Sequence, residues 1–346
     1  MDMEWRGGRI TRWRDTTRHF LFAFVSCALA GALGLGASDA RAQSGAYPAR
    51  PSSFVVAYTP GSANDILARI VAPEVAAALG QNVIVENKPG AGGSIGVAAV
   101  ARARNDGYTF GLVSTSTMAI NPAMYRNVPY DPKKDFALVI KLASTPTVLA
   151  VPAQSPATSV QDLMRRMASK EKTYQYGSPG AGTAQHLEAA LMAKIAGASA
   201  DHVPYRGPAE QLTALVAGQV DFGFFALPAV LGYIKDGRLR ALGITTLAPV
   251  DLLPNVPSLS TAGLDGFEKT GIWWGVVLPA GTPDATVQTL HRSFEKALAK
   301  PATQSRLIAA GYDPAPAAPA SEFTQFVSDQ IGFWADVVKT TGASID

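Results

Sequence analysis

From Arg50 onward, short runs of β-branched and aromatic residues alternate with longer stretches of helical periodicity. The first runs, 53–58, 82–86 and 109–114, predict buried strands. The stretch 65–79 predicts an amphipathic helix that ends at Gly80, and a second helix follows the loop 87–94 and runs through Ala103. This β-α-β-α-β order predicts a parallel sheet with helices on both faces, which places the chain in the α/β class.

A second series of predicted strands and helices begins after residue 146. Predicted strands lie at 147–151, 174–177, 220–225 and 240–245, and predicted helices at 160–168, 183–196, 209–217 and 228–235, with the short segment 202–203 between the second and third helices. A return strand at 272–278 and three helices, at 284–299, 301–310 and 321–341, close the chain. We therefore expect two doubly wound lobes, the first from 43–145 plus 270–346 and the second from 146–269. Two crossings, near 143–147 and 267–272, would form the hinge.

The first 42 residues have the pattern of a secretory signal peptide. Six arginines precede or flank an apolar run at 20–37, and the small-x-small site Ala40-Arg41-Ala42 predicts cleavage before Gln43. A membrane anchor is the alternative, because about 18 apolar residues could just span a bilayer. We expect export to the periplasm of a mature chain without cysteine, since the one cysteine, Cys27, lies in the apolar run.

Composition excludes several classes of protein. Hydrophobic residues make up 47% and charged residues 16%, which predicts a packed globule rather than disorder. Removing the six bases and four acids of residues 1–42 from totals of 30 and 27 leaves 24 and 23. A nearly neutral body without a basic block argues against a nucleic-acid partner.

Three predicted strands are followed by small, hydroxyl-bearing or glycine-rich turns, at 58–65, 114–117 and 178–183. Ligands of open α/β sheets bind outside the carboxyl ends of strands, and a helix N-terminus offers free N–H groups to an anion. Three such turns facing one cleft would hold a carboxylate without an arginine. The alternative is that they are ordinary caps, since Asn64, Asp65 and Thr183 are common N-cap types.

Motifs for nucleotide cofactors and metals are missing from the sequence. No G-x-G-x-x-G motif and no phosphate-binding loop motif is complete. His186, His202 and His291 lack metal-ligand spacing, so we expect no metal and no cofactor. Trp273 and Trp274 are interpreted as core and hinge packing, with a ligand contact by one of them as the alternative.

The chain resembles the Bug family, the substrate-binding receptors of tripartite tricarboxylate transporters. The resemblance covers the mature chain in order. Its motifs are Tyr47-Pro-x-Arg50, Pro60-Gly61 with Asp65 and Arg69, 85–96 (VENKPGAGGSIG), 106–109 (DGYT), 120–122 (INP), 129–132 (PYDP) with Asp135-Phe136, 202–207 (HVPYRG), 218–222 (GQVDF), 237–242 (GRLRAL) and 279–283 (PAGTP).

This resemblance implies the type II periplasmic-binding-protein fold, in which two lobes close on a carboxylated ligand. It implies no catalysis and delivery of the ligand to membrane permease subunits. An enzyme of the same fold and a ligand sensor for a signalling partner are the alternatives. We expect a monomer. The resemblance implies ligand contacts from Ser62, Ala63, Asn64, Ser114, Thr115, Ser116, Ser178, Gly182 and Thr183, with Tyr205, Phe225 and Ala226 as side walls.

Two departures from the family pattern bear on the ligand. The first turn has fewer glycines than in many relatives, and Phe225-Ala226 stand where many relatives have an acid and an amide. The missing acid argues against an amino group on the ligand, and the phenylalanines favour an apolar or aromatic carboxylate. The sequence leaves dicarboxylates, tricarboxylates, amino acids and aromatic acids open.

Overall fold

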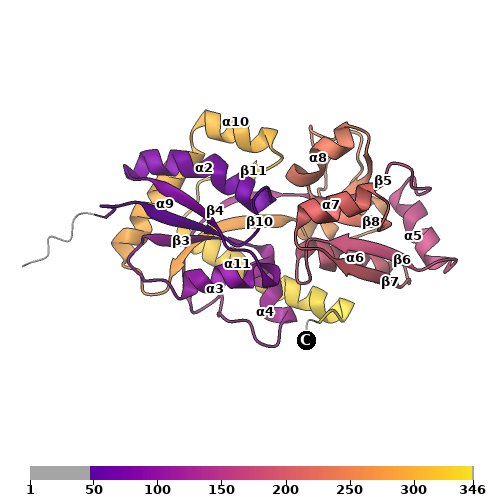
Figure 1. The fold of residues 1–346 in the computed structure, drawn as a ribbon, viewed down its shortest axis with the longest axis horizontal. Helices are drawn as coiled ribbons and strands as arrows, with labels where there is room; N and C mark the ends of the chain where they lie inside the picture. The colour runs from indigo at the N-terminus through magenta and orange to yellow at the C-terminus, as the bar shows by residue number, and fades with distance from the viewer. Residues whose placement is uncertain (1–46, 345–346) are drawn as a thin grey trace, which may run out of the picture. The chain divides into compact units, whose positions relative to one another are not determined.

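Two mixed β-sheets covered by helices make up the part of the chain that the computed structural model describes, residues 47–344 (Figure 1). The segment interpreted as a signal peptide, including Cys27, lies outside these residues. None of the helices within 47–344 is both long enough and apolar enough to cross a membrane.

Lobe 1, as we name it, is the six-stranded sheet and its helices. Its strand order is β11-β4-β10-β3-β1-β2. The strands are β1 (Ser52–Val56), β2 (Val83–Asn87), β3 (Thr109–Ser114), β4 (Phe136–Thr145), β10 (Ile272–Pro279) and β11 (Asp313–Pro314). The helices are α2 (Ala63–Leu79), α3 (Ser94–Ala101), α4 (Asn121–Met124), α9 (Asp284–Leu298), α10 (Pro301–Ala309) and α11 (Ala320–Thr341), with shorter turns η1 (Ala91–Gly93) and η2 (Ser116–Ile120).

Lobe 2 is the five-stranded sheet and its helices, with strand order β7-β6-β8-β5-β9. Its strands are β5 (Thr147–Pro152), β6 (Tyr174–Ser178), β7 (Ala200–Pro204), β8 (Phe222–Ala226) and β9 (Leu239–Ile244). Its helices are α5 (Val160–Ala168), α6 (Ala184–Ile195), α7 (Pro208–Val216) and α8 (Leu227–Lys235), with turns η3 (Ser260–Ala262) and η4 (Phe267–Lys269).

Strand direction follows from where the chain crosses between the lobes. Pro146 alone separates β4 of lobe 1 from β5 of lobe 2, and Gly271 directly precedes β10, where the chain returns. The strands that enter a sheet at a crossing run antiparallel to their neighbours, β5 to β8 and β9, and β10 to β3 and β4. As a result β1, β3, β6 and β8 all run toward the crossings.

Each sheet is buried on both faces. In β1, Phe54 and Val56 belong to one apolar cluster and Val55 to another, and β5 divides its residues in the same way. Such strands are continuous apolar runs rather than alternating ones, as expected for sheets covered by helices on both sides. The prediction of an α/β protein with two sheets is confirmed.

The structure differs from the predicted parallel sheets in the antiparallel strands. Residues 136–145 form the long strand β4, and 313–314 pair with it, although neither segment was predicted as a strand. Gly80 has φ of 69° and ends α2 as predicted, because a left-handed residue at this position suits glycine.

The contact between α11 and the lobe 1 sheet can be tested at Gly275 of β10. A Cβ atom there would lie 2.1 Å from the Phe323 ring of α11 and 2.9 Å from the carbonyl oxygen of Ile140. We expect Gly275→Ala to lower the free energy of unfolding by about 1–3 kcal/mol, as overpacked cores do. Urea denaturation measures it.

Gly232→Ala in α8 is the matched control. Nothing lies within 4 Å of a Cβ at this exposed helical position, so the substitution should raise stability by up to about 1 kcal/mol. An equal effect of both alanines would contradict the packing described for Gly275.

Candidate ligand-binding site

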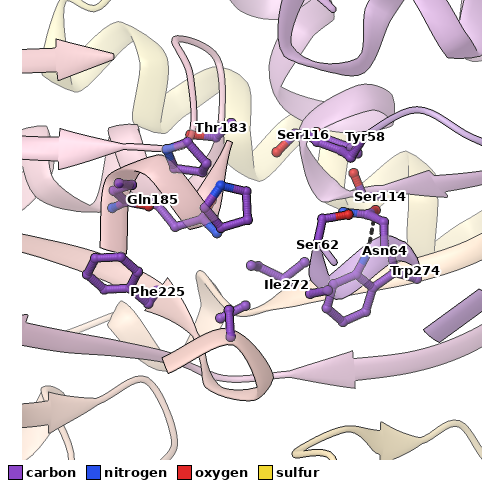
Figure 2. A pocket seen from close by; sticks show the side chains of 16 residues that line it. Tyr58, Ser62, Asn64, Ser114, Ser116, Thr183, Gln185, Phe225, Ile272 and Trp274 are labelled. Atoms are coloured by element: carbon purple, nitrogen blue, oxygen red, sulfur yellow. Dashed lines mark hydrogen bonds between the residues drawn. The ribbon is translucent and has the colours of Figure 1, made fainter. Parts of the chain in front are cut away.

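A cavity between the two lobes brings together residues from distant parts of the chain. It has an empty volume of about 500 Å³, part of it open to solvent at its mouth. Figure 2 shows Tyr58, Asn64 and Trp274 on one side, Thr183 and Phe225 on the other, with Ile272 between them. The sixteen lining residues are Tyr58, Ser62, Ala63, Asn64, Ser114, Ser116, Pro179, Thr183, Gln185, Pro208, Gln211, Phe225, Ala226, Ala229, Ile272 and Trp274.

The strand directions explain why these residues meet. Tyr58, Ser114, Pro179 and Ala226 lie at or just beyond the carboxyl ends of β1, β3, β6 and β8. The cavity therefore occupies the place where open α/β sheets bind ligands.

Four helices begin at the cavity. Ser62, Ala63 and Asn64 form the start of α2, and the other starts contribute Thr183 and Gln185 of α6, Pro208 and Gln211 of α7, and Ala226 and Ala229 of α8. The first N–H groups of a helix have no acceptor within it, and the positive end of its macrodipole lies there. Positive partial charge therefore reaches the cavity from both lobes.

None of the sixteen lining side chains is an aspartate, glutamate, lysine, arginine or histidine. Their polar groups are hydroxyls and amides, and the remainder are apolar. Burial raises the pKa of Tyr58, and the hydroxyls of Ser114 and Ser116 offset part of this shift, so the phenol stays neutral. A cavity of this composition can bind an anion through hydrogen bonds and helix dipoles alone.

The side chain of Asn64 is oriented by a tryptophan. The Trp274 Nε1–H group donates to Asn64 Oδ1 over 2.7 Å (Figure 2). An indole N–H can only donate, so the amide oxygen faces Trp274 and the Asn64 NH₂ group is left to donate to another partner. Asn64 is thereby available as a hydrogen-bond donor at the start of α2.

The lobes touch each other beside the cavity. The Ala184 N–H at the start of α6 donates to Ser116 Oγ of lobe 1 over 3.3 Å. The Tyr125 hydroxyl of lobe 1 donates to the Ala181 carbonyl of lobe 2 over 3.5 Å. These contacts indicate a closed arrangement of the lobes.

Eight of the twelve residues predicted for the site line this cavity: Ser62, Ala63, Asn64, Ser114, Ser116, Thr183, Phe225 and Ala226. Two of them also cap helices. Thr183 is one of the caps that the sequence offered as the alternative, whereas the cap of α2 is Ser62 rather than Asn64 or Asp65. Ser62 Oγ accepts from the Asp65 N–H at the start of α2, and Thr183 Oγ1 accepts from the His186 N–H at the start of α6.

The other four predicted residues lie outside the lining set. Thr115 is fully buried and accepts the Trp273 N–H through its hydroxyl, over 2.9 Å. Ser178 Oγ lies 2.6 Å from His202 Nε2, and the Gly182 N–H donates to His186 Nδ1. The Tyr205 ring packs against Gly177. Their role in binding stays a prediction.

Eight lining residues were not predicted, and most of them lie in the recognised turns or at the starts of the predicted helices. Tyr58 and Pro179 stand in two of those turns, and Gln185, Pro208, Gln211 and Ala229 are among the first four residues of α6, α7 and α8, so adding the first turn of each helix would have found them. Ile272 lies at the start of β10, where no local sequence signal points to a site. Trp274 was named as a ligand contact only in the alternative interpretation.

Two stacked histidines support the loop that leads into α6. The rings of His186 and His202 are stacked with centroids 3.9 Å apart, and Tyr176 stacks on His202. Burial, and next the neighbouring His202, lowers the pKa of His186 to about 3. Burial lowers the pKa of His202 to about 4. Both rings are therefore neutral at pH 7, and their role is packing.

Lowering the pH should destabilise the folded protein through these two histidines. An unfolded histidine binds a proton below about pH 6.5, whereas the folded pair resists protonation to about pH 4. Stability is therefore lost as pH falls from 6.5 toward 4, on the order of 2 kcal/mol by pH 5 for the buried His186 and less for His202, which is partly exposed so that solvent screens its charge.

Denaturation of the wild-type protein and of His202→Gln at pH 7 and pH 5 measures this loss. Glutamine can still bond Ser178 but does not titrate, so the variant should lose less stability than the wild-type protein between pH 7 and pH 5. An identical loss in the two proteins would contradict a histidine origin.

No cluster of three or more histidine, cysteine, aspartate or glutamate side chains suited to a metal ion occurs within residues 47–344.

Comparison with known proteins identifies the family. Residues 67–343 match the family model described as the tripartite tricarboxylate transporter family receptor. A UPF0065 protein from the tcbD-tcbE intergenic region of Pseudomonas sp. strain P51 is 38% identical over 294 residues, 84% of this chain and 87% of the relative.

Solved structures agree with this assignment. The periplasmic binding protein BugD is 31% identical, with a TM-score of 0.81 over 86% of this chain and 99% of BugD. The R. palustris protein Rpa4515, solved with adipate, is 32% identical, with a TM-score of 0.82 over 86% of this chain and 99% of its own. The fold is thus that of the periplasmic binding proteins, as expected, and these relatives are solute-binding proteins rather than enzymes. The chain belongs to the receptor family of the tripartite tricarboxylate transporters, in which the Bug proteins are found.

Proposed function

We propose that this protein is an exported receptor that captures a small carboxylate in the cavity between its lobes and delivers it to the permease of a tripartite tricarboxylate-type transporter. The observation that carries the proposal is the convergence of four helix N-termini, one from lobe 1 and three from lobe 2, on a cavity whose lining has no charged side chain. A carboxylate suits this environment because its charge is complemented by N–H groups that have no acceptor within the backbone of their own helix.

The apolar part of the cavity favours a particular kind of carboxylate. Phe225, Ile272 and Trp274 offer apolar surface, and no acid lines the cavity to pair with an ammonium group. The relative solved with adipate holds a flexible dicarboxylate with an apolar chain. Adipate is therefore the first ligand to test, with shorter dicarboxylates and aromatic acids next.

The periplasmic location and the permease partner are supported by different observations. The predicted signal peptide and the periplasmic relative BugD support residence in the periplasm. The matching family is named for its transporters, which supports a membrane permease as the partner that receives the ligand.

A ligand screen by thermal unfolding tests the proposal. A carboxylate at a hundredfold excess over its Kd should stabilise the protein by about 2.7 kcal/mol. We expect stabilisation by adipate or another carboxylate of the panel and none by the matching diamide. A panel in which neutral and cationic compounds stabilise the protein and carboxylates do not would contradict the proposal.

Asn64→Asp tests the site itself. The substitution keeps the shape of the side chain and lets the Trp274 N–H group donate as before, but places a negative charge at the start of α2. Repulsion between charges about 4 Å apart amounts to about 4 kcal/mol at an effective dielectric constant of 20, so carboxylate affinity should fall by at least about a hundredfold.

Gln304→Glu is the matched control, because it makes the same charge change at an exposed position of α10. Calorimetric titration should give wild-type affinity for this variant. Equal losses in both variants would show that net charge, not the cavity, decides binding.

A further inference from the structure

A carboxyl group is buried where the chain crosses between the lobes. Glu188, in the second turn of α6, has no exposed surface. Its Oε1 atom accepts hydrogen bonds from the Thr147 hydroxyl over 2.7 Å and from the Thr270 hydroxyl over 2.8 Å. Glu188 does not line the ligand cavity.

These two threonines belong to the two crossings. Thr147 begins β5 directly after Pro146, and Thr270 stands one residue before β10, next to Gly271. The Thr147 N–H also donates to Thr245 Oγ1 over 2.8 Å, which ties in the end of β9. One carboxyl oxygen therefore joins the lobe 2 ends of both crossings, the places where any rotation of the lobes must occur.

The burial of Glu188 depends on contact between the lobes. Ala184 and Leu187 of the same helix pack into the apolar cluster that is otherwise built mainly from lobe 1, and Leu191 packs against it. Glu188 lies on this face of α6, since residues three and four apart are neighbours on a helix. The long helix α11 of lobe 1 also contacts α6. Separation of the lobes would admit water to this face.

No charged partner balances a negative charge on Glu188. Burial raises its pKa to about 8, and the Thr147 and Thr270 hydroxyls oppose the shift. Its Oε2 atom has no hydrogen-bond partner within residues 47–344.

Titratable groups on the neighbouring elements do not contribute to this shift of the Glu188 pKa. Those on α6 and on the elements packed against it are His186, Lys194, Asp162, Arg165, Arg166, Tyr174, Tyr176, Asp201, His202, Glu268, Lys269, Glu322, Asp329, Asp336 and Lys339.

We propose that Glu188 is a latch that joins the two interlobe crossings, uncharged when the lobes are closed and ionised when they open, so that closure on a ligand takes up one proton. The proposal rests on the proposed function in one respect, that a ligand favours the closed lobes. The hydrated carboxyl of the open form titrates near its ordinary value of 4.5, and the closed form titrates near 8. Between these values each rise of one pH unit weakens closure, by up to about tenfold.

Proton uptake on binding is the direct test. Calorimetric titration with adipate at pH 7.5, in two buffers of different ionisation enthalpy, counts the protons taken up. We expect about three quarters of a proton for the wild-type protein, because a carboxyl with a pKa of about 8 is protonated to that extent at pH 7.5. We expect none for Glu188→Gln, whose amide can still accept from a threonine. No uptake in the wild-type protein, or equal uptake in both, would overturn the latch.

The dissociation constant provides a second readout. The Kd for adipate should rise by at least about tenfold between pH 6.5 and 8.5 in the wild-type protein, over a range where both carboxyl groups of adipate are ionised. In Glu188→Gln it should change less than twofold. A purely structural role for Glu188 would lower affinity in the variant equally at every pH, and that result overturns the proposal.

A test without ligand separates this inference from the proposed function. If neither protein binds adipate, adipate fails as the ligand, and the ligand-free protein still tests the latch. Because the carboxyl has the higher pKa in the closed form, protonation itself favours closure. The radius of gyration of the ligand-free wild-type protein, measured by small-angle X-ray scattering, should therefore fall as pH is lowered from 9 to 5, whereas that of Glu188→Gln should not change. The same pH dependence in both proteins, or none in the wild-type protein, overturns the proposal.

If the variant does not fold, the wild-type protein labelled with ¹³C at its glutamate carboxyls decides. In the complex with adipate, a carboxyl resonance that titrates near pH 8 supports the latch. Titration of every glutamate of this complex below pH 6 overturns it.

Discussion

The direction in which strands meet the cleft is the constraint on which the rest of the structure depends. The chain enters each sheet from a crossing, at β5 and at β10, and these strands must run away from the cleft. Their parallel neighbours β1, β3, β6 and β8 run toward it and lead into the turns and helices that line the cavity. The positive ends of four helices therefore converge from two lobes, and the site needs no charged side chain to attract an anion.

Local patterns predicted much of the fold. Apolar runs bounded by turns gave the strands, and Gly80 marked the end of α2 because its left-handed backbone suits glycine. The strand β4 was missed because its sequence, FALVIKLAST, contains Lys141 and Ser144 and has no turn signal before β5. The strand β11 has only two residues, too few for a periodic pattern that would predict a strand.

Candidate site residues that stand in local sequence patterns could be predicted, whereas those brought together only by the tertiary fold could not. Ser62, Asn64 and Thr183 stand in turns that lead into helices, a signal that lies in the sequence itself. The same signal also named Ser178 and Thr115, which do not line the cavity and whose hydroxyls are engaged with His202 and with the Trp273 backbone. Trp274 meets Asn64 across 210 positions of sequence, a contact that only the folded sheet creates.

Closure and binding are linked through the same two lobes. Ser116 and Ala184 meet beside the cavity, while Glu188 joins the crossings on α6, the helix that Ala184 begins. One helix thus presents its N-terminus to the cavity and its buried carboxyl to the crossings. A change at the N-terminus of α6 reaches Glu188, and the reverse, through about one turn of helix.

The central claim is that main-chain N–H groups at the helix starts hold the anion. Backbone ¹⁵N–¹H spectra of the labelled protein, recorded with and without its carboxylate ligand, test it most directly. Hydrogen bonding to a carboxylate should move the amide protons of Ala63, Asn64 and Gln185 downfield, together with others in the first turns of α2, α6, α7 and α8. A ligand that binds tightly while these protons stay in place, with shifts elsewhere, would contradict the account.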